Sequence, residues 1–71
     1  MIADNLEELT WKDVGKFLKF GDKIKIENKK RQEAIFLYIT TQGEDIILFD
    51  PIENDLDCYV WRYVLKFGEK I

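Results

Sequence analysis

A change of hydrophobic pattern in residues 18–26, Leu-Lys-Phe-Gly-Asp-Lys-Ile-Lys-Ile, constrains the fold of this chain more than any other feature. Before it, apolar residues recur with the period of a helix, and after it they alternate with charged residues. Alternation places successive side chains on opposite faces of a strand. A Gly-Asp pair directly before such a run is typical of the first strand of a small β-barrel. The pattern therefore predicts a helix followed by an all-β unit.

The predicted helix covers about residues 10–19. Thr10 and Asp13, three residues apart, form a loose capping-box pattern at its start. Gly15 costs about 1 kcal/mol relative to alanine in a helix, so we expect this helix to depend on packing against the barrel. Its apolar face would consist of Trp11, Val14, Phe17 and Leu18.

Three strand patterns follow, at 23–27, 33–41 and 46–49, within a barrel predicted over about 22–70. The first alternates isoleucine with charged residues and is expected to be half-buried. The second is apolar on both faces, which is typical of a central or strongly bent strand. Strict alternation in this strand predicts that Ile35, Leu37 and Ile39 lie on one face. Phe36 and Tyr38 would lie on the other face.

The last third of the chain fits two patterns. Apolar residues in 56–67 recur at helical spacing, yet residues 59–67 also alternate as a strand would. The run Cys-Tyr-Val-Trp-Arg-Tyr-Val is aromatic and β-branched, which favours a strand. We therefore expect a short helical turn near 51–56, where Asp50-Pro51 resembles a helix start, followed by a strand; the helical alternative stays open.

Size and composition predict one small domain over residues 1–71, expected to be monomeric. The chain is 46% apolar and 14% aromatic, which distinguishes it from a disordered chain. No apolar run approaches the roughly 20 residues of a membrane helix, and the acidic N-terminus does not resemble a signal peptide. With Cys58 as the single cysteine, no internal disulfide can form, so a cytoplasmic location is expected.

Enzymatic activity is not expected. The chain has no histidine, the usual general base, and no glycine-rich phosphate loop. Cys58 lies next to Asp57, which would raise the pKa of a thiol, and we expect Cys58 to be a small core residue. We predict no catalytic residues, no cofactor and no metal site.

An acidic window near the predicted turn is the one pattern that resembles a cation site. A calcium loop needs ligands at alternating positions and a central glycine, and only Asp55-x-Asp57 fits. A solvated acidic turn is the preferred interpretation. The window contains Asp50, Glu53, Asn54, Asp55 and Asp57.

Charge is strongly segregated along the chain. Residues 21–31 have a net charge of +3, whereas residues 32–57 contain seven acids and no base. A basic hairpin over 23–31, with Tyr38, Tyr59 or Trp61 nearby, could bind phosphates and stack on bases, as single-strand binders do. The pI of about 4.8 argues against this function. The candidate phosphate-binding residues are Lys23, Lys25, Lys29, Lys30 and Arg31.

Several of these features together resemble a known family. The helix up to Phe20, the opening Gly21-Asp22-Lys23-Ile24 and the hairpin-spaced strands resemble an SH3-like barrel. With the chain length and the aromatic end Tyr59-Val60-Trp61-Arg62-Tyr63, the whole chain is similar to the YorP family of short bacterial and prophage proteins. The resemblance implies a five-stranded SH3-like barrel with an N-terminal helix and a phage origin. It implies no assigned function and supplies no site residues.

The predicted function is that of a small non-enzymatic binding module with a protein partner. SH3-like barrels often present an aromatic groove where extended peptides dock. The acidic segment 50–57 would form the rim of such a groove. Weak nucleic-acid binding through the hairpin 23–31 is the alternative. The candidate partner-binding residues are Tyr38, Tyr59, Trp61 and Tyr63.

Overall fold

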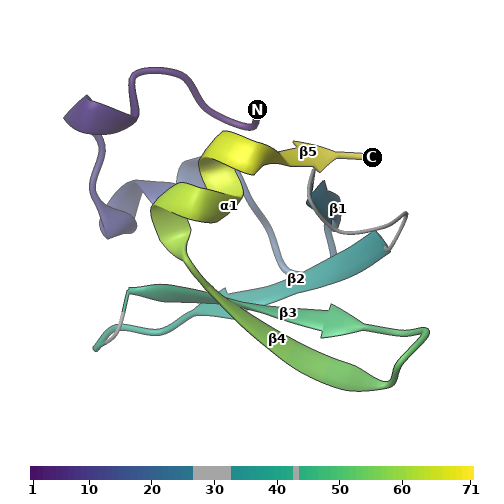
Figure 1. Ribbon diagram of the computed structural model, residues 1–71. Helices are drawn as coiled ribbons and strands as arrows, with labels where there is room; N and C mark the ends of the chain where they lie inside the picture. The colour runs from purple at the N-terminus through teal and green to yellow at the C-terminus, as the bar shows by residue number, and fades with distance from the viewer. Residues whose placement is uncertain (27–32, 43) are drawn as a thin grey trace.

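One antiparallel sheet organises the molecule (Figure 1). The structure is a computed structural model that describes residues 1–26, 33–42 and 44–71. Within this part of the chain, five strands lie in the order β4-β3-β2-β1-β5. Their bounds are β1 Lys23–Ile26, β2 Glu33–Ile39, β3 Asp45–Asp50, β4 Asp55–Val60 and β5 Gly68–Lys70. The mainly-β, SH3-like prediction is confirmed, although no pairing between the outermost strands β4 and β5 closes the described sheet into a barrel.

Helical segments cover one side of this sheet. The helix α1 (Trp61–Phe67) follows β4 directly, and the 3-10 helices η1 (Leu6–Glu8) and η2 (Trp11–Lys16) precede β1. Figure 1 shows α1 and the N-terminal turns on the same side of β2, β3 and β4. The N–H of Ile2 donates to the carbonyl of Leu65 at 2.8 Å, which ties the start of the chain to α1.

The core lies between the sheet and this helical layer. Its residues come from the N-terminal segment, the strands β1, β2 and β3, and the helix α1. The largest of the fully buried side chains is that of Trp61 at the start of α1. The core consists of Ala3, Val14, Leu18, Ile24, Ile26, Ala34, Phe36, Ile46, Leu48, Trp61, Val64 and Leu65.

The predicted N-terminal helix forms, but as the short 3-10 helix η2 rather than over residues 10–19. The capping box is confirmed: the N–H of Thr10 donates to Asp13 Oδ2 at 2.8 Å, and Thr10 Oγ1 accepts from the N–H of Lys12 at 3.3 Å. The predicted apolar face is confirmed as well, because all four of its residues are buried or pack against the core. Gly15 is the second-last residue of η2, and the segment does not extend into a regular α-helix.

A β-bulge in β2 changes the predicted assignment of faces. Phe36 pairs with Leu48 and Tyr38 pairs with Ile47, so Leu37 is an extra residue without a partner opposite it. The extra residue reverses the alternation beyond it. Tyr38 therefore joins the face opposite Phe36, and the prediction that the two share a face is wrong.

The prediction for the C-terminal third is partly wrong. Residues 51–54 form a turn, in which Asp50 Oδ1 accepts from the N–H groups of Ile52 and Glu53 at 2.9 and 3.2 Å. The strand then ends at Val60, and residues 61–67 are helical. Helical spacing lets Trp61, Val64 and Leu65 all enter the core, and this burial outweighs the strand propensity of the segment.

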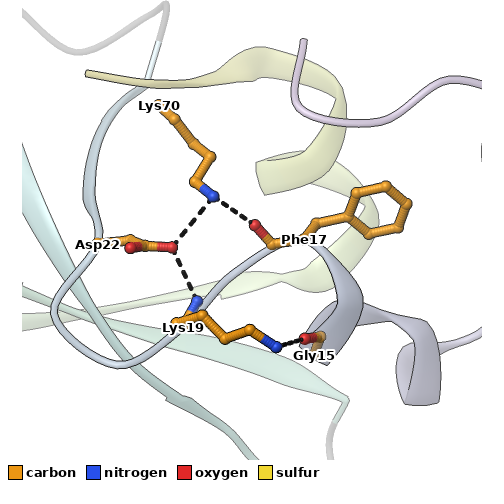
Figure 2. Close-up of polar contacts among 5 residues, drawn as sticks. All are labelled: Gly15, Phe17, Lys19, Asp22 and Lys70. Carbon is orange, nitrogen blue, oxygen red and sulfur yellow. Dashed lines mark hydrogen bonds and ion pairs between the residues drawn. The ribbon is translucent and has the colours of Figure 1, made fainter.

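A polar contact joins the two ends of the all-β unit (Figure 2). Lys70 Nζ of β5 donates to the carbonyl of Phe17 at 2.8 Å and pairs with Asp22 Oδ2 at 3.2 Å. The same Asp22 oxygen accepts from the N–H of Lys19 at 2.8 Å. Between Lys19 and Asp22 in the chain, Gly21 has a φ of 94°, a conformation that favours glycine. The Gly-Asp pair of the sequence pattern thus forms the turn into β1.

Replacing Gly68 tests the close packing of β5 against the end of α1 and against β1. A Cβ at this position would lie 2.5 Å from the carbonyl oxygen of Val64, and 3.2 Å from the Ile24 side chain. We expect Gly68→Ala to lower the free energy of unfolding by about 1–3 kcal/mol, measured by urea denaturation. Gly15→Ala is the matched control, because a Cβ there meets nothing within 4 Å; it should leave stability unchanged or raise it by up to about 1 kcal/mol. Equal effects of the two substitutions would contradict this packing.

Acidification tests the contact at Asp22. The bond from the Lys19 N–H, and then the Lys70 ammonium, lower the pKa of Asp22 below 3.8. Because the folded pKa is the lower one, this stabilisation is present above the unfolded pKa and is lost as pH falls through the folded pKa. We expect the urea midpoint of Asp22→Asn to fall less steeply than that of the wild type from about pH 5 to pH 2.

The Lys70→Met variant separates the two causes of this shift. It removes the ion pair but keeps the Lys19 N–H bond, so it should retain part of the pH dependence that Asp22→Asn loses. Identical pH profiles for the wild type and Asp22→Asn would contradict the assignment.

Candidate functional site

An apolar surface lies on the side of β2, β3 and β4 that faces away from α1. The register of the strands brings its residues together in rows across the sheet: Ile35 lies opposite Phe49 and Phe49 opposite Leu56, while Ile47 lies between Tyr38 and Cys58. We call this surface the outer face. It consists of Ile35, Tyr38, Ile47, Phe49, Leu56, Cys58 and Val60.

The outer face is open to solvent and is not a second part of the core. Tyr38, Leu56 and Val60 are 56%, 58% and 55% exposed. The half-buried Ile47 and Phe49 are not among the residues that pack against the core cluster. In Figure 1, no described element covers this side of β2, β3 and β4. Single exposed apolar residues are common on proteins, but a contiguous apolar patch is a mark of an interaction site.

The candidate aromatic residues do not form one groove. Trp61 is only 2% exposed and belongs to the core, which removes it from the candidates. Tyr59 and Tyr63 are half-buried, pack against the core and stack on each other with ring centroids 5.6 Å apart, so they fix α1 to β4. Tyr38 is exposed and lies on the outer face, on the other side of the sheet.

The basic candidates are only partly described. Lys23 and Lys25 are exposed on β1, as the alternating pattern predicts. Lys25 lies directly opposite Glu33 of β2 and Glu69 of β5, so carboxylates flank it on both sides. Such neighbours oppose the approach of a phosphate group. Lys29, Lys30 and Arg31 lie outside the described residues.

The acidic window supports the β3–β4 turn. Asp50 is 4% exposed, and its Oδ1 atom binds the two amides of the turn. Asp55 Oδ1 accepts from the N–H of Leu56 at 2.9 Å. Within residues 1–26, 33–42 and 44–71, no group of three or more acidic or thiol side chains is arranged to hold a metal ion.

Cys58 is exposed, so the prediction that it is a core residue is wrong. It lies on the outer face of an edge strand, which no described layer of the chain covers. Partial desolvation, and then the negative charge of Asp45, raise the pKa of the Cys58 thiol above 9.0. The sequence interpretation named Asp57 as the acid responsible, but Asp57 lies on the opposite face of β4, whereas Asp45 lies on the same face as Cys58.

Sequence reasoning missed most of the outer face. A sequence signal that could have indicated this face is the run Ile46-Ile47-Leu48-Phe49, which is apolar on both faces of β3. Such a run usually indicates a strand buried on both sides. In this fold only Ile46 and Leu48 enter the core, and the other two residues lie on the outer face.

Comparison with family models, curated proteins and solved structures finds no match to this chain. The similarity to the YorP family therefore stays a prediction from the sequence. Among the described residues, no helix is long and apolar enough to cross a membrane.

The reactivity of Cys58 tests the geometry of the outer face. A raised pKa leaves little thiolate at neutral pH, so an exposed Cys58 should react more slowly with iodoacetamide than an unstructured cysteine peptide. Asp45→Asn removes the nearby charge and should increase the rate measured at pH 8. The matched control is Asp4→Asn, an exposed acid of the N-terminal segment, which should leave the rate unchanged. Equal rates for all three proteins would contradict the placement of Asp45 beside Cys58.

Proposed function

We propose that this protein is a small non-enzymatic binding module that recognises another protein through the outer face. One observation carries the proposal: apolar residues from three adjacent strands form a continuous surface that no described part of the chain covers. In a chain with so little core, leaving residues such as Phe49 and Ile47 outside it forgoes apolar burial that would stabilise the fold. A partner that covers the outer face recovers this burial on binding.

The surface also has the anatomy of a protein-binding site. Its middle row, Ile47 and Phe49, is apolar, and beside Ile47 lies the exposed Tyr38, a residue type enriched at interfaces. Charged residues lie beside the outer face on the same side of the sheet, including Asp45 opposite Val60 and Lys23 opposite Ile35. The candidate surface is therefore the outer face rather than an aromatic groove.

A protein partner is preferred over a nucleic acid. The outer face is apolar, and its charged neighbours are of both signs, Asp45 beside Val60 and Lys23 beside Ile35, so it is not the continuous basic surface that phosphates require. Of the basic candidates in the described chain, Lys25 lies between two glutamates. The cytoplasmic location and the phage origin are also proposals, and they rest on the sequence alone.

Selection of binders from a random peptide library tests the proposal. We expect the wild-type protein to enrich peptides whose affinity falls about ten-fold, equivalent to about 1.4 kcal/mol, in Tyr38→Lys. Phe20→Lys is the control for charge and aromatic area, since Phe20 is 79% exposed and lies in the turn before β1 rather than on one of the three strands that form the outer face. This variant makes the same change of charge and a similar change of aromatic area, and its affinity should stay within about two-fold of the wild type.

The outcomes of this selection are distinct. Failure to enrich any peptide, or equal losses in Tyr38→Lys and Phe20→Lys, would contradict the proposal. Saturable binding of a single-stranded oligonucleotide, with NMR shifts confined to 23–31 that vanish with added salt, would replace it with the nucleic-acid alternative.

A further inference from the structure

The free edge of β4 directs its backbone groups toward solvent. β4 is an outermost strand of the sheet, and within the described chain it pairs only with β3. The N–H of Trp61 donates to the carbonyl of Glu44 across the β3–β4 ladder. The next pair of the ladder is Asp45 and Val60. Here the Asp45 carbonyl points away from β4, toward β2, where it accepts from the N–H of Thr40. Because antiparallel strands alternate, the N–H and C=O groups of Leu56, Cys58 and Val60 point away from β3.

These three residues also carry the side chains of β4 that belong to the outer face. The exposed edge and the apolar surface therefore meet along the same strand. Of the outward N–H groups, that of Leu56 already donates to the Asp55 carboxylate, whereas those of Cys58 and Val60 lie outside the ladder with β3. The edge contains no lysine and no proline, and its pairing with β3 runs without a bulge from Asp45 to Asp50. Lysine, proline and bulges are devices by which proteins block the addition of another strand, as are charged side chains such as Asp55 and Asp57, whose charge a basic partner strand would neutralise.

Charge complementarity indicates which strand would fit. On the side of β4 opposite the outer face, the residues are Asp55, Asp57 and Tyr59. An added strand places its residues on the same face as those directly opposite them. Apolar side chains would thus lie beside Leu56, Cys58 and Val60, and basic side chains beside the two aspartates. Among the described residues, the ion pairs involve neither Asp55 nor Asp57.

We propose that β4 binds an extended segment of a partner protein, in which apolar and basic residues alternate, as an additional antiparallel strand. This inference rests on the proposed function and names the partner's chemistry. The added strand bonds the outward backbone groups of Cys58 and Val60 and extends the outer face by one row. This is strand addition at a sheet edge, where main-chain bonds supply affinity and alternate side chains supply specificity.

A second copy of this chain fits the same edge less well. Antiparallel pairing of two β4 strands would bring Asp55 and Asp57 of one copy close to the same residues of the other copy. Each molecule also has a net charge of −3. Like charges brought together in this way oppose association. A basic segment instead neutralises these acids.

The test uses the full chain and a labelled peptide, acetyl-Lys-Val-Lys-Val-Lys-Val-Lys-amide. We expect saturable binding by fluorescence anisotropy and NMR shifts concentrated on the amides of β4. A peptide of the same composition in the order Val-Val-Val-Lys-Lys-Lys-Lys should bind at least ten-fold more weakly, because it cannot place apolar and basic residues on opposite faces. In the protein, Val60→Lys should weaken binding of the alternating peptide at least ten-fold.

Ile52→Lys is the matched control. It adds the same charge at an apolar residue that is 72% exposed, but in the turn rather than on β4. Its affinity should stay within about two-fold of the wild type. Urea denaturation of both variants establishes that each remains folded at the temperature of the binding assay.

Several outcomes would overturn the inference. These are equal binding of the two peptides, equal losses in Val60→Lys and Ile52→Lys, or shifts that lie outside β4. A concentration-dependent dimer in sedimentation that Val60→Lys abolishes would make a second copy the occupant instead. If library peptides bind the outer face but do not compete with the alternating peptide, this inference fails while the proposed function stands.

Discussion

Burial of Trp61 is the interaction on which the rest of the structure depends. β4 passes into α1 without a loop, so the first residue of the helix is also the largest fully buried side chain of the core. Once Trp61 is fixed, α1 lies across the sheet and Val64 and Leu65 enter the core behind it. Leu65 in turn accepts the N–H of Ile2, and Gly68 begins the strand that pairs with β1.

This arrangement also explains why the two faces of the sheet differ. One α-helix and the N-terminal turns are enough to cover one side of β2, β3 and β4 (Figure 1). With 71 residues, the chain has little material for a second layer. The bulge at Leu37 adds Tyr38 to the uncovered side. The outer face and the open edge of β4 thus follow from how the core is built, and they are the surface to which we assign binding.

The sequence predicts the parts of this fold that local patterns determine. The Gly-Asp turn, the alternation of Ile24 and Ile26, and the Thr10–Asp13 capping box all depend on residues close together in the chain. The predictions that are wrong concern features that depend on contacts between distant segments. The helical and strand patterns of residues 59–67 were equally regular, and only the burial of Trp61 and Leu65 decides between them. Likewise, no local signal marks Leu37 as a bulge or Cys58 as exposed, since both depend on the register with β3. The outer face could not be predicted for the same reason.

Amide hydrogen exchange of the free protein, measured residue by residue by NMR, tests the central claim most directly. The alternation within β4 predicts slow exchange for Asp57 and Tyr59, whose N–H groups point toward β3, and fast exchange for Cys58 and Val60, whose N–H groups point to the open edge. Uniform protection along β4 in the dilute free protein would show that this edge is already covered, and would contradict our assignment of the outer face and the β4 edge as the binding surface.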